Sequence, residues 1–180
     1  MDCAAPPLTR RALRVRGQVQ GVGFRPFVYR LAQDLALSGR VLNDGMGVQI
    51  EVQGEAKQLD VFMRRLEREA PRLARIDAVE SRTAEPQPEE SRFVIDASGA
   101  GPVATGVTPD AAPCPDCIAE MLNPPDRRWR YAFTNCTNCG PRYTITAALP
   151  YDRPNTSMAR FAQCPACRRE YDDPAERRFH

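Results

Sequence analysis

The chain has 180 residues and a formal net charge of +2, a length that accommodates one domain of about 100 residues and a smaller unit. No segment approaches the roughly 18 apolar residues that cross a bilayer, and the first residues lack the apolar run of a signal peptide, so we expect a cytoplasmic protein without a membrane partner. The small net charge produces no overall field that would demand a nucleic-acid partner.

The N-terminal half begins with alternating strand and helix patterns. Residues 13–19 place apolar side chains at every second position, the spacing of a half-buried strand. Residues 24–35 then carry apolar side chains at helical spacing. Residues 39–54 fit a hairpin with Asp44-Gly45 in its turn, and a second helical stripe follows over residues 59–70.

Two further strand patterns complete this part of the chain, at residues 75–81 and 92–98. The order is βαββαβ with a short extra strand. It predicts an α+β sandwich over residues 12–98, with two helices on one antiparallel sheet, after a disordered tail at residues 1–11.

The stretch GQVQGVGFRP, residues 17–26, joins the first strand to the first helix. Its small residues allow backbone N–H groups to point inward at the positive end of the helix, which forms a nest for a tetrahedral anion. Arg25 adds a fork of donors for phosphate. A glycine-rich turn with a solvated Arg25 explains the pattern equally well. The candidate phosphate-binding residues are Gln20, Gly21, Val22, Gly23, Phe24 and Arg25.

Residues 99–113 have no periodicity and are predicted to be a linker. Beyond them, the pair Cys114 and Cys117 is separated by 18 residues from Cys136 and Cys139, which is typical of a Cys₄ zinc ribbon. Four thiolates favour a closed, structural Zn²⁺ site, so we predict a small zinc-ribbon domain at residues 114–163. A redox Cys-x-x-Cys pair is the alternative, but it would follow a strand in a βαβ unit that the sequence does not contain.

The segment CPDCIAEMLNPPDRRWR, which begins at Cys114, recurs 50 residues later as CPACRREYDDPAERRFH, which begins at Cys164. Cysteines equivalent to Cys136 and Cys139 would follow the last residue. We therefore interpret residues 164–180, with Cys164 and Cys167, as a truncated second zinc finger of a truncated protein. His180 is an alternative third ligand, although it aligns with an arginine. We expect residues 168–180 to be poorly ordered or to pack on the first finger.

Cys3, outside the Cys-x-x-Cys pairs, is predicted to be an unreactive thiol. Residues 114–180 contain ten Arg and eight acidic side chains, and a Cys₄–zinc site adds two negative charges. This region is therefore near neutral, which argues against nucleic-acid binding.

Two longer stretches, GQVQGVGFRPFVYRLA and GRVLNDGMGVQIEVQG, resemble the acylphosphatase family. The resemblance implies a ferredoxin-like sandwich and hydrolysis of acyl phosphates. It also implies catalytic roles for two residues: Arg25 as the arginine that binds phosphate, and Asn43 as the asparagine that positions the attacking water.

The cysteine-containing segments, with ALPYDRPNTSMA between them, resemble the HypF family, the carbamoyltransferases of [NiFe]-hydrogenase maturation. In that family an acylphosphatase domain and two Cys₄ fingers precede YrdC-like and Kae1-like domains, which are missing here. The resemblance implies that the full-length protein uses carbamoyl phosphate and ATP to pass a carbamoyl group to a HypE-type acceptor, for the cyanide ligands of the hydrogenase. This chain would bind and hydrolyse carbamoyl phosphate. A free-standing acylphosphatase and a zinc-ribbon interaction module are the alternatives.

Overall fold

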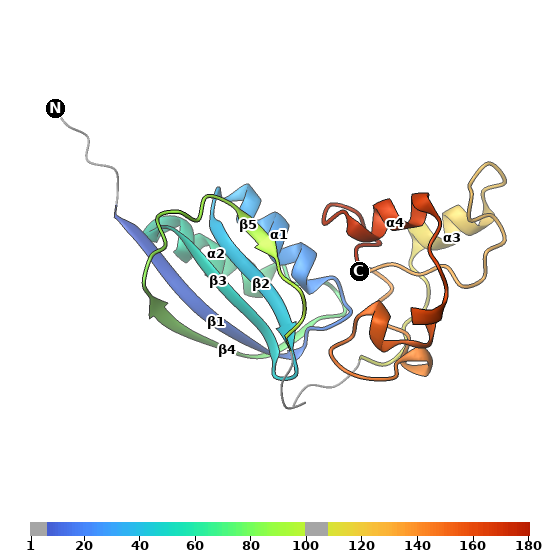
Figure 1. Ribbon diagram of the computed structural model, residues 1–180, viewed down its shortest axis with the longest axis horizontal. Helices are drawn as coiled ribbons and strands as arrows, with labels where there is room; N and C mark the ends of the chain where they lie inside the picture. Colours follow the sequence, from blue (N-terminus) through green and yellow to red (C-terminus); the bar gives the residue numbers. More distant parts are fainter. Residues whose placement is uncertain (1–6, 100–107) are drawn as a thin grey trace.

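The computed structural model describes residues 7–99 and 108–180, in two parts that lie side by side (Figure 1). The first part, here called the sheet domain, is residues 8–99, and the second, the cysteine region, is residues 108–180. Cys3 and most of the predicted linker lie outside the described residues. The elements of the sheet domain are β1 (Leu8–Gln18), α1 (Phe24–Asp34), β2 (Ser38–Asp44), β3 (Gly47–Glu55), α2 (Ala56–Arg68), β4 (Arg75–Ala84) and β5 (Phe93–Ile95).

The sheet has the strand order β4-β1-β3-β2-β5, and α1 and α2 cover one of its faces (Figure 1). The predicted βαββαβ order with a short extra strand is confirmed. The prediction of a purely antiparallel sheet is wrong at one edge, because β5 pairs with β2 in the parallel direction. The chain passes from β4 at one edge to β5 at the other, and β5 there lies beside β2, a strand distant in sequence whose direction local patterns do not encode.

The core lies between the sheet and the helices. Alternation in β3 buries Val48, Ile50 and Val52 completely, as predicted, and the helical stripe of α2 buries Leu59 and Phe62. Each fully buried side chain of this size contributes about 1.5–3 kcal/mol relative to an exposed one. The sheet domain therefore has a core of its own, and among the residues that the structure describes no cysteine contributes to it.

Two predicted boundaries differ from the observed ones. β1 begins at Leu8, inside the predicted tail of residues 1–11, because it pairs with β3 from Leu8↔Glu55 onward. The β2–β3 hairpin closes at Asp44↔Gly47, so that Gly45 and Met46, rather than Asp44 and Gly45, form its two-residue turn.

The early start of β1 also buries Arg10, whose exposed fraction is 1%. Its guanidinium donates to Gln53 Oε1 at 3.0 Å and to Glu51 Oε2 at 2.6 Å, and it pairs with Glu90 as well. A buried guanidinium needs such partners, because an unpaired buried charge is strongly destabilising.

The cysteine region is built from short helices and turns, α3 (Pro115–Leu122), η1 (Tyr143–Ile145), η2 (Arg153–Asn155), η3 (Ser157–Arg160) and α4 (Pro165–Asp172). A zinc ribbon usually contains β-strands, whereas sheet structure in residues 108–180 is limited to a single β-bridge, Thr146↔Thr156. The four cysteines are therefore held by short helices and turns. Within residues 7–99 and 108–180, no helix combines the length and the apolar character that crossing a membrane requires.

Candidate functional site

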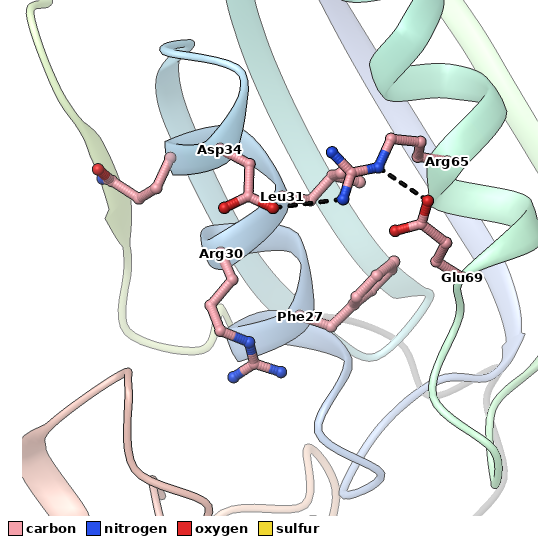
Figure 2. A pocket seen from close by; sticks show the side chains of 7 residues that line it. Phe27, Arg30, Leu31, Asp34, Arg65 and Glu69 are labelled. Carbon is pink, nitrogen blue, oxygen red and sulfur yellow. Dashed lines mark hydrogen bonds and ion pairs between the residues drawn. The ribbon is translucent and has the colours of Figure 1, made fainter.

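A pocket of about 340 Å³ lies between α1 and α2, and it contains none of the predicted site residues (Figure 2). Arg65 extends across it and pairs with Asp34 at 3.3 Å and with Glu69 at 2.8 Å. Its guanidinium is therefore engaged by acidic side chains. The pocket is lined by Phe27, Arg30, Leu31, Gln33, Asp34, Arg65 and Glu69.

The predicted phosphate loop lies between β1 and the first turn of α1. Gly21 and Gly23 both have left-handed backbones, with φ of 72° and 77°, and Gly23 is the N-cap of α1. Alternation of left-handed and right-handed residues turns successive N–H groups toward one side and favours anion binding. The side chains of Val22 and Phe24 point into the core and are 1% exposed, which anchors the loop to the sheet domain.

Gln20 holds the base of the loop with its side chain rather than facing a ligand with it. Its amide nitrogen donates to the carbonyl oxygens of Asp44 and Gly47 at 2.6 and 3.0 Å. Its amide oxygen accepts from the backbone N–H of Tyr151 at 3.3 Å. Gln20 therefore connects the loop to the β2–β3 turn and to the cysteine region.

Arg25, in the first turn of α1, is 6% exposed, so the alternative of a solvated arginine is wrong. Its guanidinium donates to Ser98 Oγ at 3.1 Å and pairs with Asp152 Oδ1 at 2.5 Å. The Ser98 hydroxyl also donates to Asp152. These contacts form a closed triad at the end of the loop.

Asn43, on β2, is 1% exposed, and its carbonyl oxygen accepts from Gly99 N–H at 2.7 Å. Ser98, the neighbour of Gly99, contacts Arg25, so the segment 98–99 brings Asn43 and Arg25 to the same end of the sheet. Among the residues that the structure describes, the buried amide oxygen of Asn43 has no hydrogen-bond partner. Four other buried side-chain polar atoms of the described residues, among them Asn135 Oδ1, share this state. The Asn43 oxygen is free to accept a hydrogen bond from a small polar molecule.

Asp152 was not indicated by any local sequence pattern. It lies 127 positions from Arg25, within ALPYDRPNTSMA, and only the packing of the cysteine region brings it to the loop. Burial alone would raise the pKa of Asp152, but His180, Arg25 and Ser98 together lower it. Asp152 is therefore an ionised carboxylate that neutralises Arg25.

The four cysteines Cys114, Cys117, Cys136 and Cys139 form one cluster, in which all sulfur atoms lie within 4.8 Å of one another. Three sulfur pairs are separated by 3.6–3.7 Å. Sulfur atoms about 3.8 Å apart are expected around a tetrahedral ion with Zn–S bonds of about 2.3 Å. The donor set and its spacing thus fit a four-coordinate metal ion.

The second predicted pair, Cys164 and Cys167, repeats the local geometry of the first. Cys164 is the N-cap of α4, with φ −66° and ψ 160°, and Cys114 is the N-cap of α3 with φ −71° and ψ 161°. Among the described residues, this pair joins no cluster of three or more candidate ligands. His180 stacks on Tyr171 and Phe179, with Nδ1 3.7 Å from Asp152.

Reciprocal arginine–glutamate ion pairs connect the two repeats. Glu120 on α3 forms ion pairs with Arg177 and Arg178 of the second repeat. Glu170 on α4 forms ion pairs with Arg127 and Arg128 of the first repeat. Residues 168–180 therefore pack on the first finger, one of the two expected outcomes.

The same arginines reach the cysteine sulfurs of the opposite repeat. Arg177 Nη1 lies 3.0 Å from Cys117 Sγ, and Arg127 Nη1 lies 3.3 Å from Cys167 Sγ. Burial would raise the pKa of the Cys117 thiol, but Arg177 and other neighbours lower it to about 7. The spacing of the cysteines did not indicate these arginines, although the repeat places them at equivalent positions.

Comparison with known proteins assigns both parts of the chain. Residues 11–95 match the acylphosphatase family, and residues 114–146, with the four clustered cysteines, match the HypF finger family. An acylphosphatase of Oceanobacillus iheyensis is 38% identical over 84 residues, which cover 46% of this chain and 92% of that protein.

Longer matches extend over both parts. Carbamoyltransferase HypF of Rhodobacter capsulatus is 58% identical over 168 residues, covering 93% of this chain and 22% of that protein. A crystal structure of full-length HypF in the phosphate- and nucleotide-bound form superposes with a TM-score of 0.92 and 45% identity, covering 99% of this chain and 24% of that one. The chain thus spans about a fifth to a quarter of the length of these HypF proteins. It belongs to the acylphosphatase family, and a HypF finger follows its acylphosphatase domain.

Proposed function

We propose that the sheet domain binds carbamoyl phosphate at loop 20–25 and hydrolyses it, as part of a carbamoyltransferase of the HypF type. The observation that carries this proposal is the loop of left-handed glycines, which leads into the buried Arg25 and lies at the same end of the sheet as Asn43. The similarity to proteins named acylphosphatase and carbamoyltransferase HypF supports the reaction and the substrate.

The first step is binding of the phosphoryl group. The backbone N–H groups of Gln20, Gly21, Val22, Gly23 and Phe24, at the positive end of α1, hold its oxygens, and Arg25 adds a full positive charge. In phosphoryl transfer the charge on the equatorial oxygens must be stabilised while the attacking and leaving oxygens are in line. The fixed loop supplies that stabilisation without reorganising.

The second step is attack by water. The side-chain amide of Asn43 orients the water, a positioning role that requires no proton transfer to Asn43. Carbamoyl phosphate is a mixed anhydride with a good leaving group, so an oxygen of its own phosphoryl group accepts the proton and no strong base is required. Loop 20–25 contains neither Cys nor Ser, so direct attack by water is proposed rather than a covalent intermediate.

We assign the ion of the four-cysteine site as Zn²⁺, because four thiolates in a tetrahedral arrangement suit it. All four positions are protein ligands, so the ion stabilises the fold of the finger and leaves no position for a substrate. Cys164 and Cys167 are assigned as two ligands of a second site of the same kind.

The wider role follows from the relatives. In the whole protein, carbamate would proceed to ATP-dependent adenylation and then to a HypE-type acceptor, steps that we place in the parts of the HypF proteins that this chain does not match. The thiolate chemistry of the cysteine pairs favours the reducing cytoplasm. The near-neutral charge of the cysteine region favours a protein and small-molecule role over nucleic-acid binding.

Two variants test the proposal through phosphate titration and a carbamoyl-phosphate hydrolysis assay. Arg25→Ala should abolish detectable phosphate binding and hydrolysis, because Arg25 binds the phosphoryl group in both the ground state and the transition state. Asn43→Ala should lower kcat by about 100-fold or more and leave phosphate affinity near the parent value, because only the positioning of water is lost.

Arg30→Ala is the matched control, since Arg30 is an exposed arginine of the same helix. It should leave both measurements unchanged. Phosphate binding to Arg25→Ala at the parent affinity would show that loop 20–25 is not the phosphate site.

A further inference from the structure

The phosphate loop is covered by the cysteine region. A Cβ atom on Gly21 would lie 2.7 Å from Tyr151 Cδ1, and one on Gly23 would lie 2.9 Å from Thr137 Cβ. Gln20 and Arg25 add a hydrogen bond to Tyr151 and an ion pair to Asp152. The Oceanobacillus acylphosphatase, matched over 92% of its length by 84 residues, has almost no chain left for such a cover. The cover therefore distinguishes this loop from that of the single-domain relative.

The carboxylate of Asp152 pairs with Arg25, the same arginine that is proposed to bind phosphate. Its side chain is 13% exposed and that of Arg25 is 7% exposed, so water screens this pair poorly. A carboxylate and a phosphoryl group accept from the same N–H donors of a guanidinium. Here Asp152 Oδ1 pairs with Arg25 Nη2, while Arg25 Nη1 donates to Ser98. Ser98, which contacts Arg25 and Asp152, fixes the carboxylate in this position.

We propose that Asp152 is a residue of the anion site, which neutralises Arg25 while the loop is empty and competes with the phosphoryl group for the guanidinium. Asp152 thereby sets the affinity of the loop for phosphate. A bound phosphoryl group brings a second negative charge to a shielded site, so either Asp152 leaves Arg25 or the two anions repel each other. This inference rests on the proposed role of the loop as a phosphoryl site.

A purely structural role for Asp152 makes the opposite prediction. If the ion pair only holds the cysteine region on the sheet domain, loss of the carboxylate loosens the cover and leaves phosphate affinity unchanged or lower. The competing role predicts tighter binding when the negative charge is removed and the size of the side chain is kept. Asp152→Asn meets both conditions.

Calorimetric titration of the full chain with inorganic phosphate separates these roles. Asp152→Asn should bind phosphate at least about tenfold more tightly than the parent chain, because the competing charge is gone. Asp77→Asn is the control, since Asp77 is an exposed partner of Arg75 and its loss changes the net charge by the same amount. Equal or weaker binding by Asp152→Asn would overturn the proposal.

A second measurement needs no substitution at Asp152. In the parent chain labelled with ¹³C-aspartate, saturating phosphate should shift the Asp152 carboxylate signal, because Arg25 exchanges one anion for the other. In Arg25→Ala the signal should not respond to phosphate. A carboxylate signal that stays unmoved in the parent chain at saturation would refute the competition.

The hydrolysis assay distinguishes failure of this inference from failure of the proposed reaction. Hydrolysis that depends on Arg25, together with unchanged phosphate affinity in Asp152→Asn, would leave the reaction standing and reject the role of Asp152. Tighter, Arg25-dependent phosphate binding by Asp152→Asn without any hydrolysis would support the role of Asp152 and reject the reaction.

Discussion

Arg177 offers a quantitative test of how the two cysteine repeats support each other's metal ligands. Its guanidinium lies 3.0 Å from Cys117 Sγ. Two full charges at that separation, with an effective dielectric constant of about 20, would attract each other by about 5.5 kcal/mol. Three features reduce this: the thiolate shares its charge with the ion, the side chain of Arg177 is 20% exposed, and Glu120 also engages it.

The net contribution should be about 1.4–2.7 kcal/mol, which corresponds to the 10–100-fold loss of metal affinity typical when a group that supports a metal ligand is removed. Arg177→Gln should therefore lower Zn²⁺ affinity by this factor in a chelator-competition assay, while the four ligands remain.

The control is Arg168→Gln, because Arg168 is 62% exposed and pairs with Asp172 within its own helix. It should leave Zn²⁺ affinity at the parent value. If Arg177→Gln and the parent chain release Zn²⁺ to the chelator equally, the guanidinium does not stabilise the thiolate.

Four further outcomes are expected. Cys136→Ser should lose the metal and unfold the finger but preserve slow amide exchange in the sheet domain, which has its own core; loss of protection in both parts would contradict this. Gly21→Ala should lower the free energy of unfolding by at least about 1 kcal/mol, because of its left-handed φ, and should weaken phosphate binding; Gly99→Ala, whose Cβ would make only ordinary van der Waals contacts from 3.6 Å outward, is the control for stability. Arg10→Leu should cost about 3 kcal/mol in urea unfolding, and a loss below about 1 kcal/mol would show that its acidic partners rearrange. Burial raises the pKa of Glu51, but Arg10 and Arg40 lower it overall. The stabilisation of the fold by ionised Glu51 is therefore complete above the unfolded pKa of about 4.3 and is lost as the pH falls below that value. Glu51→Gln should reduce this loss of stability in acid.

The elements of the sheet domain were predictable because each is recorded in a local periodicity. Alternation identified β3 through Val48, Ile50 and Val52, and a helical stripe identified α2 through Leu59 and Phe62. The loop and the cysteine cluster were predictable for the same reason. A glycine loop before a helix and a Cys-x-x-Cys pair each bring their functional atoms together within a few residues.

Long-range contacts required the tertiary structure. The parallel direction of β5, the early start of β1 and the burial of Arg10 depend on strands that are distant in sequence. The clearest case is Arg25, whose pattern fitted a solvated side chain as well as a phosphate ligand. Packing of the cysteine region on loop 20–25 buries Arg25 and supplies Asp152 as its counter-ion, and no local pattern can specify a partner 127 residues away.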